Sequence, residues 1–329
     1  MAIDCGGEVA RAASILRQGG LVAFATETVY GLGADALNPK AVARVFAVKR
    51  RPEFDPLIVH VASPTWLPRL TQAVIPSARK LMDAFWPGPL SIVLPKADCV
   101  PDLVTAGLPD VAIRIPDHPL AQALLSAADR PLAAPSANLF GRVSPTRAEH
   151  VAEQFQTGID YILDGGACRV GVESTVVRFL ADRTGSWQCE LLRPGGVTIE
   201  QLRQVIGPVS VAEDTAHPVL QAQSAPGRLP RHYAPRTPVR IVSGPTLPGE
   251  SGRVGFLSRG PLADSSGFAA IEVLSQTGDL SECAVGFFAA LRRLDSADLD
   301  LILAESFPER ELGRALNDRL RRAANAAVV

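Results

Sequence analysis

Short apolar runs bounded by glycine, proline or asparagine recur along the N-terminal part of the chain. They alternate with stretches whose apolar positions lie three and four residues apart. The first pattern predicts buried strands and the second amphipathic helices. The predicted strands are Leu21–Ala25, Leu90–Leu94, Val111–Ile115, Leu132–Ala134, Tyr161–Leu163, Val172–Leu180 and Gln188–Leu192. The predicted helices are Glu8–Gln18, Asn38–Arg51, Ser77–Phe85, His118–Ala127, a segment capped by Thr146 and ending at Phe155, and Ile199–Ile206. Because strands alternate with helices but also follow one another directly, we expect an α/β fold with a mixed sheet.

The periodicity disappears between residues 210 and 238, where five prolines favour an extended linker. It resumes at Val239 and continues to the end of the chain. The predicted strands there are Val239–Val242, Val254–Leu257, Ile271–Leu274 and Leu299–Ala304, and the predicted helices are Ser281–Leu294 and Arg310–Ala324. We therefore expect a first domain over residues 1–209, a linker over 210–238 and a smaller Rossmann-like α/β domain over 239–329. The second domain lacks a GxGxxG turn, so no nucleotide site is predicted there.

Composition changes this picture mainly by what it excludes. A chain of 329 residues is long enough for two cores, and its net charge of −1 gives no overall attraction to nucleic acid or to an anionic membrane. The five cysteines are scattered without a CxxC pair, which favours reduced thiols over disulfides or a zinc site. There is no signal-peptide pattern and no apolar run of transmembrane length. We therefore expect a cytoplasmic protein without a metal site of its own, and any anion site must be local.

Three cations, Lys49, Arg50 and Arg51, end the predicted helix that follows the first strand. Lys49 continues the inward-facing apolar stripe of that helix. Cations in a last helical turn complement the helix dipole, by about 0.3–1 kcal/mol each. However, no acid lies between Asp35 and Glu53, so the cluster lacks a local partner in sequence. A bound phosphate would supply one through charge-assisted hydrogen bonds, and this interpretation is favoured.

Arg114 lies among apolar neighbours in a predicted strand. A buried guanidinium requires an anion. The anion could be a ligand, or a carboxylate of the chain such as Asp110 or Asp117.

Other polar residues are ambiguous one by one. His60, in the apolar run PLIVHV, is more often a core histidine than a ligand. Ser136 and Asn138 follow a strand and suit a turn as well as a site, and Ser174 and Thr175 in VESTVV suit an ordinary strand. The stretch TETVYGLG places hydroxyls and glycines at a strand end, which is common in ligand sites. The sequence contains no GxSxG, HExxH or P-loop motif.

Taken together, these segments have a recognisable order: TETVYGLG, KRRPEFDPLIVH, VAIRIPDHP, APSANLFGRVSPT, GVESTVV, LRPG and PRHYAP. The set resembles the YrdC-like threonylcarbamoyl-AMP synthases in their longer, two-domain form. The resemblance extends from about Gly7 to the C-terminal stretch RELGRALNDRLRRAA. It implies a first domain with a twisted mixed sheet and helices around a concave cavity, and a smaller Rossmann-like C-terminal domain.

The resemblance also implies site residues. Positions matching an L-threonine site are Thr28, His60, Arg114, Ala134 and Ser174. Positions matching an ATP site are Lys49, Arg51, Asp55, Asp110, Ser136, Asn138, Ser144, Arg193 and Tyr233. Of these, Lys49 and Arg51 match the cations that act on the triphosphate, and they are the expected catalytic residues. Asp110 stands where the family usually has threonine.

The reaction implied is formation of threonylcarbamoyl-AMP and pyrophosphate from L-threonine, bicarbonate or CO2, and ATP. Mg2+ would accompany ATP without a fixed protein ligand. The product would pass to a transferase complex that modifies tRNA beside the anticodon, and the linker would close over the cavity as a lid. Two other functions stay open: an RNA-binding protein that uses the same basic cavity, and an enzyme that forms carbamoyl-AMP without threonine. Membrane attachment is not expected, and the sequence leaves open whether the protein binds RNA directly and stably.

Overall fold

A computed structural model describes residues 3–181, 185–212, 232–244 and 252–325. The strands of the larger sheet are β1 (Cys5–Gly6), β2 (Val22–Phe24), β3 (Gly31–Asp35), β4 (Ile58–His60), β5 (Leu90–Pro95), β6 (Asp110–Arg114), β7 (Leu132–Ala133), β8 (Tyr161–Leu163), β9 (Thr175–Ala181), β10 (Trp187–Arg193) and β11 (Val209–Val211). They form one sheet in the order β1-β8-β2-β3-β7-β4-β6-β5-β9-β10-β11. The sheet is mixed, as predicted, because β2 pairs parallel with β8 and antiparallel with β3.

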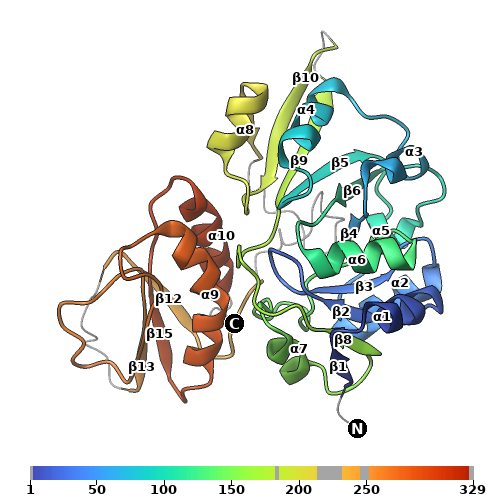
Figure 1. Cartoon of the computed structure of the whole chain (residues 1–329). Coiled ribbons are helices and arrows are strands. Elements are labelled where there is room, and N and C mark those ends of the chain that lie inside the picture. The colour runs from blue at the N-terminus through green and yellow to red at the C-terminus, as the bar shows by residue number, and fades with distance from the viewer. Residues whose placement is uncertain (1–2, 182–184, 213–231, 245–251, 326–329) are drawn as a thin grey trace.

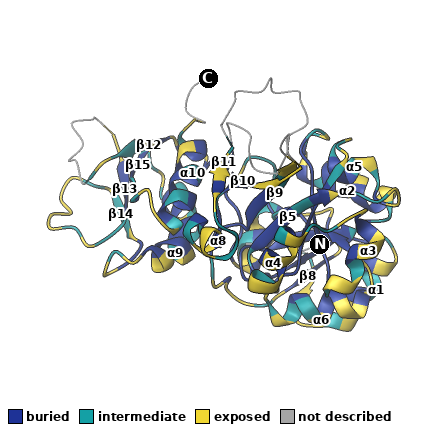
Figure 2. Ribbon diagram, turned by 90° about the horizontal axis from the view of Figure 1, so that it is seen from above, coloured by how far each residue is buried: buried dark blue, intermediate teal, exposed yellow. Residues whose placement is uncertain are grey.

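Helices cover this sheet (Figure 1). They are α1 (Val9–Arg17), α2 (Pro39–Lys49), the short 3-10 turn η1 (Pro64–Trp66), α3 (Leu67–Leu70), α4 (Pro76–Phe85), α5 (Asp102–Thr105), α6 (Pro119–Ala128), α7 (Ala148–Gln154) and α8 (Ile199–Ile206). Figure 2 shows dark, buried strands and helices whose outer faces are exposed, as expected of amphipathic elements packed on a core. The predicted helices are confirmed within a few residues. The predicted cap at Thr146 is wrong, since α7 begins after Arg147 and that N-cap makes no side-chain hydrogen bond.

Helix α2 shows how the sequence sets one wall of the site. The Asn38 side chain accepts hydrogen bonds from the backbone N–H groups of Lys40 and Ala41, and Pro39 occupies the first turn. The helix ends at Lys49 because Arg50 takes a left-handed conformation with φ of 53°. The chain therefore turns sharply, and the residue that follows, Arg51, is buried while Arg50 stays exposed.

Some strands were not predicted from the sequence. β3 is rich in glycine, which is uncommon in strands. Its Gly33 lies against β2, where a Cβ atom would come within 2.9 Å of Phe24. β11 pairs parallel with β10 and occupies the start of the segment expected to be a linker. Residues 213–231 of that segment lie outside the described residues.

The second sheet has four strands, β12 (Val239–Val242), β13 (Val254–Ser258), β14 (Ala270–Val273) and β15 (Leu301–Glu305). All pairs are parallel, in the order β12-β15-β13-β14. Helices α9 (Leu280–Asp295) and α10 (Leu312–Ala324) lie between this sheet and the larger body (Figure 1). The expected α/β class and its second α/β unit are both confirmed.

Candidate functional site

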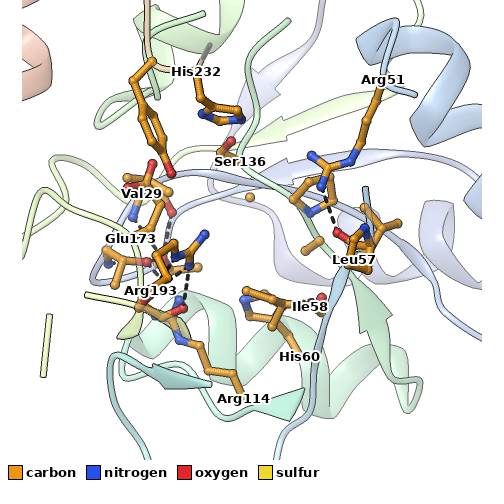
Figure 3. Close-up of a pocket in the computed structure, with 18 residues that line it drawn as sticks. Val29, Arg51, Leu57, Ile58, His60, Arg114, Ser136, Glu173, Arg193 and His232 are labelled. Carbon is orange, nitrogen blue, oxygen red and sulfur yellow. Dashed lines mark hydrogen bonds between the residues drawn. The ribbon is translucent and has the colours of Figure 1, made fainter. Parts of the chain in front are cut away.

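A cavity opens where the ends of several strands of the larger sheet meet (Figure 3). Its lining residues come from segments far apart in sequence. They are Thr26, Thr28, Val29, Gly31, Arg51, Pro56, Leu57, Ile58, His60, Arg114, Ala134, Pro135, Ser136, Glu173, Ser174, Arg193, His232 and Tyr233. The lining includes all five residues of the implied L-threonine set. From the implied ATP set it includes Arg51, Ser136, Arg193 and Tyr233.

Arg114, at the end of β6, is paired inside the chain. Its Nη2 lies 2.5 Å from Oε1 of Glu27, and its Nη1 donates to Oγ1 of Thr28 at 3.0 Å. Glu27 and Arg114 are both buried. The carboxylate partner is therefore Glu27, and neither Asp110 nor Asp117 fills that role. Thr28 and Arg114 lie side by side in the cavity wall, as a carboxylate-binding pair would.

His60 ends β4 and also lines the cavity. Burial, followed by the nearby Arg114, lowers the pKa of this histidine to about 3. Its Nδ1 lies 3.2 Å from the carbonyl oxygen of Ile58. The imidazole is therefore neutral at ordinary pH, and it presents a polar but uncharged edge to a ligand.

Arg51 has a partner that the sequence analysis did not recognise. Its Nη2 lies 2.9 Å from Oδ2 of Asp55, and its guanidinium also donates to the carbonyl oxygens of Asp55 and Pro56. The expectation that the cation cluster lacks a local partner is therefore wrong for Arg51. Asp55 is fully buried and orients the arginine from behind.

Lys49 does not line the cavity. Its Nζ donates to the carbonyl oxygen of Ser136 at 2.5 Å and to that of Asn138. Burial, together with the positive charge of Arg51, places the pKa of Lys49 well below its ordinary value. In this conformation Lys49 holds the turn that carries Ser136 at the cavity wall.

Besides Lys49 and Asp55, three residues of the implied ATP set lie outside the lining. Asn138 is buried and donates to the carbonyl oxygens of Leu139 and Arg142, which orders its loop. Ser144 donates to Oε1 of Glu173 at 2.5 Å. Asp110 begins β6 and is half-buried, and the structure does not bring it to the cavity.

Two acids in or beside the cavity were missed from the sequence, Glu27 and Glu173. Each directly precedes a hydroxyl residue that had been singled out, Thr28 and Ser174. The predicted strand from Val172 was too long, since β9 begins at Thr175. The two residues directly before β9, Glu173 and Ser174, are the ones that line the cavity.

Arg193 ends β10 and donates to the carbonyl oxygen of Ser174 at 2.8 Å and to its Oγ at 3.2 Å. Burial lowers the pKa of this arginine. Figure 3 shows Arg193 and Glu173 on one side of the cavity and Arg51 on the opposite side. Buried cations thus approach one hollow from separate directions, which suits a ligand carrying several negative charges.

Comparison with known proteins agrees with this geometry. Residues 14–195 match a Sua5, YciO and YrdC family model described as "Telomere recombination", and residues 197–325 match one described as "Threonylcarbamoyl-AMP synthase, C-terminal domain". A threonylcarbamoyl-AMP synthase of Pyrococcus abyssi is 43% identical over 97% of this chain and 94% of its own length. The chain belongs to the threonylcarbamoyl-AMP synthase family. A second member, from Bacillus subtilis, is 42% identical over 98% of this chain and 94% of its own.

Within the threonylcarbamoyl-AMP synthase family, a solved structure has nearly the same fold. The crystal structure of Pyrococcus abyssi Sua5 complexed with L-threonine matches with a TM-score of 0.89 and 40% identity, covering 98% of this chain and 97% of that one. Family membership confirms the resemblance identified in the sequence. No helix in the described part of the chain is long and apolar enough to cross a membrane.

Proposed function

We propose that this protein joins L-threonine, bicarbonate or CO2, and ATP into L-threonylcarbamoyladenylate, with release of pyrophosphate. The observation that carries the proposal is the convergence of three buried arginines and several hydroxyls on one cavity. The arginines are Arg51, Arg114 and Arg193. Family membership supports the same reaction, a nucleotidyl transfer.

Arg114, Thr28 and His60 form the wall proposed for L-threonine. The guanidinium of Arg114 suits the amino-acid carboxylate, because its planar fork matches two oxygens. Glu27 holds this arginine in place before substrate arrives. Neutral His60 and the hydroxyl of Ser174 remain to contact the polar side chain and the amine.

Arg51, Arg193, Ser136 and Tyr233 form the wall proposed for ATP. Arg51 would offset charge on the triphosphate, since Asp55 leaves part of its guanidinium facing the cavity. Lys49 could offset charge on the triphosphate only if its ammonium group released the carbonyl oxygens of Ser136 and Asn138. Asn138 and Ser144 support this wall from behind. Asp110 is not needed for the proposal.

The chemistry requires no covalent bond to the protein. The threonine amine adds CO2 and loses a proton to give a carbamate. A carbamate oxygen then attacks the α-phosphorus, and the bond to the leaving pyrophosphate breaks. The hydroxyls that line the cavity make no hydrogen bond to a histidine within the described residues, so none belongs to a serine–histidine or threonine–histidine pair. Catalysis here would consist of positioning and charge stabilisation.

Mg2+ is proposed to enter with ATP, coordinated by phosphate oxygens and water. The described residues contain no group of three or more His, Cys, Asp or Glu that could hold a metal ion. The cavity carboxylate, Glu173, already accepts hydrogen bonds from Ser144 and from Arg319 of α10. We therefore assign no step to protein-bound metal. A tRNA-modifying transferase as the next partner, and a cytoplasmic location, remain predictions from the sequence.

The test is release of pyrophosphate from ATP and bicarbonate with and without L-threonine. Release that depends on threonine, with L-threonylcarbamoyladenylate identified by mass spectrometry, is the expected result. Release without threonine would indicate a carbamoyl-AMP-forming enzyme instead. Salt-sensitive RNA binding with no pyrophosphate release would favour an RNA-binding protein and contradict the proposal.

A further inference from the structure

One arginine of the C-terminal helix α10 reaches the cavity wall of the larger domain. The side chain of Arg319 is wholly buried, and its Nε donates to Oε2 of Glu173 at 3.0 Å. Glu173 lines the cavity, and its other oxygen accepts the hydroxyl proton of Ser144. A residue 146 positions further along the chain than Glu173 therefore fixes this cavity carboxylate.

The same guanidinium holds two more parts of this wall. Its Nη1 donates to the carbonyl oxygen of Pro194 at 2.6 Å, directly after the cavity residue Arg193. Its central carbon lies 5.4 Å from the centre of the Tyr233 ring, which also lines the cavity. Arg319 is thus the common contact of Glu173, the turn after β10 and Tyr233.

The charges explain why an arginine is useful at this place. A buried carboxylate in a cavity for phosphates would repel its ligand unless a cation offset it. Burial acts to lower the pKa of Arg319, but Tyr233, Glu173 and Asp318 outweigh it and raise that pKa above its ordinary value. Arg319 therefore stays charged beside Glu173.

We propose that Arg319 is a positioning residue for ATP, through which the C-terminal domain completes the nucleotide-facing wall of the cavity. The inference rests on the proposed function and adds to it a role for the C-terminal domain. Arg319 acts through Glu173, Pro194 and Tyr233, and in the described part of the chain it has no hydrogen bond or ion pair to Glu27 or Arg114.

This arrangement predicts a selective kinetic effect. Replacing Arg319 should disturb ATP binding more than L-threonine binding, because Arg114, the proposed partner of the threonine carboxylate, is held by Glu27 and not by Arg319. A purely structural role would lower the active fraction, which reduces kcat and leaves both KM values unchanged. The ratio of the two KM changes therefore distinguishes positioning from general destabilisation.

The experiment compares Arg319→Met and Arg319→Lys with wild type in the full-length protein. Arg319→Met should raise the KM for ATP about tenfold, equivalent to about 1.4 kcal/mol, with the KM for L-threonine within about twofold. Arg319→Lys keeps the charge but lacks the planar fork, so an intermediate rise is expected. The matched control is Arg314→Met, which removes another α10 arginine whose ion pair is to Glu200 of α8, away from the cavity. Both KM values of this control should stay within about twofold of wild type.

A double-variant cycle with Glu173→Gln tests the route of the effect. If Arg319 acts through Glu173, the combined variant should raise the KM for ATP less than the product of the two single effects. Equal changes in both KM values, an unchanged KM for ATP, or fully multiplicative effects would overturn the inference. If Arg319→Met does not fold, the inference is tested with Arg319→Lys and with a double-variant cycle that combines Arg319→Lys and Glu173→Gln. Wild-type protein without threonine-dependent pyrophosphate release would instead overturn the proposed function.

Discussion

The protonation state of His60 is the first property that the structure determines at the level of single residues. Its pKa in the folded protein is about 3, against 6.5 for an ordinary histidine, because of burial and the charge of Arg114. We expect the imidazole of His60 to stay neutral between pH 5 and 8. Nitrogen NMR of histidine-labelled protein, with the signal assigned through His60→Gln, measures this directly. A titration midpoint near 6.5 would contradict it.

The same shift has a consequence for stability. The unfolded chain binds more protons than the folded one between the two pKa values of His60, about 3 and 6.5. The contribution of His60 to the free energy of unfolding is therefore full above pH 6.5, its pKa in the unfolded chain. It is lost as the pH falls toward about 3, its pKa in the folded protein. His60→Gln should weaken the drop in thermal midpoint between pH 7 and pH 5. An unchanged drop would show that His60 does not contribute to it.

Arg114 gives a prediction about the amino-acid wall. Arg114→Lys retains a charge beside Glu27 but cannot bind two carboxylate oxygens with a planar fork. We expect the KM for L-threonine to rise at least about tenfold, with a much smaller change for ATP. Steady-state kinetics with each substrate varied in turn measures both. Arg169→Lys, at an exposed ion pair with Asp117, is the matched control and should behave as wild type. A rise in the KM for ATP alone would contradict this prediction and would place Arg114 in the nucleotide subsite.

Sequence reasoning indicated half of the residues that line the cavity but did not indicate their partners. Buried cations and hydroxyls are visible as chemical types in an apolar context, as with Arg114 and Arg51. The partner of a buried cation depends on which loops meet in space. Glu27 was therefore not recognised as the partner of Arg114, although it directly precedes Thr28 in the sequence. For Lys49 the helical stripe correctly indicated burial, but the carbonyl oxygens it contacts belong to a turn about ninety residues away.

At the scale of elements, predictions succeeded where one residue type determines the outcome. The predicted cap at Asn38 begins α2, although the helix ends at Lys49, two residues before the predicted end at Arg51. Predictions failed where a strand is rich in glycine, as in β3, or where a strand is very short, as in β11. Such strands are specified by their neighbours in the sheet, and a sequence window does not contain those neighbours.

The turn after β10 provides a prediction at this scale. A Cβ atom on Gly195 would lie 2.3 Å from the carbonyl oxygen of Glu173 and 2.4 Å from the backbone of Ser174 and Thr175. Gly195→Ala must therefore separate the turn from the start of β9, which displaces both Glu173 and Ser174. We expect a loss of pyrophosphate release of at least about a hundredfold, because small misplacements at a site cost about that much. Gly7→Ala is the control, since nothing lies within 4 Å of its Cβ position. Normal activity of Gly195→Ala would show that the turn adapts.

At the scale of the whole molecule, the two domains share a cluster of buried hydrophobic side chains. One cluster of buried side chains joins Val29, Val143 and Val172 of the larger domain to Tyr233 and to apolar residues of α9 and α10. The cavity wall of the larger domain therefore packs against the C-terminal helices α9 and α10. Because sequence patterns describe each domain separately, they predicted both domains but not this contact. It also explains how Arg319 can act on a cavity formed mainly by the first domain.

Tyr233 lies in this shared core, and its ring and its hydroxyl have separable roles. The residue is buried, its ring centre lies 5.7 Å from that of Phe288, and its Oη has no hydrogen-bond partner among the described residues. Burial, then the charge of Glu173, raises the pKa of Tyr233 to about 12, so the hydroxyl keeps its proton and can donate it. The residue lines the cavity. Tyr233→Phe should raise the KM for ATP by about threefold to tenfold, as expected for one lost hydrogen bond, with the thermal midpoint unchanged.

Tyr233→Ala should behave differently, because it removes the ring from the contact with α9. Truncating a large buried aromatic residue costs about 3–5 kcal/mol. A clear fall in the thermal midpoint is therefore expected in addition to the kinetic effect. Differential scanning calorimetry of both variants beside wild type separates the two roles. If Tyr233→Phe matches wild type in the KM for ATP, the hydroxyl does not contact the nucleotide. If Tyr233→Ala keeps the wild-type midpoint, the ring does not hold the two domains together, and the C-terminal domain would have to act on the cavity through Arg319 alone.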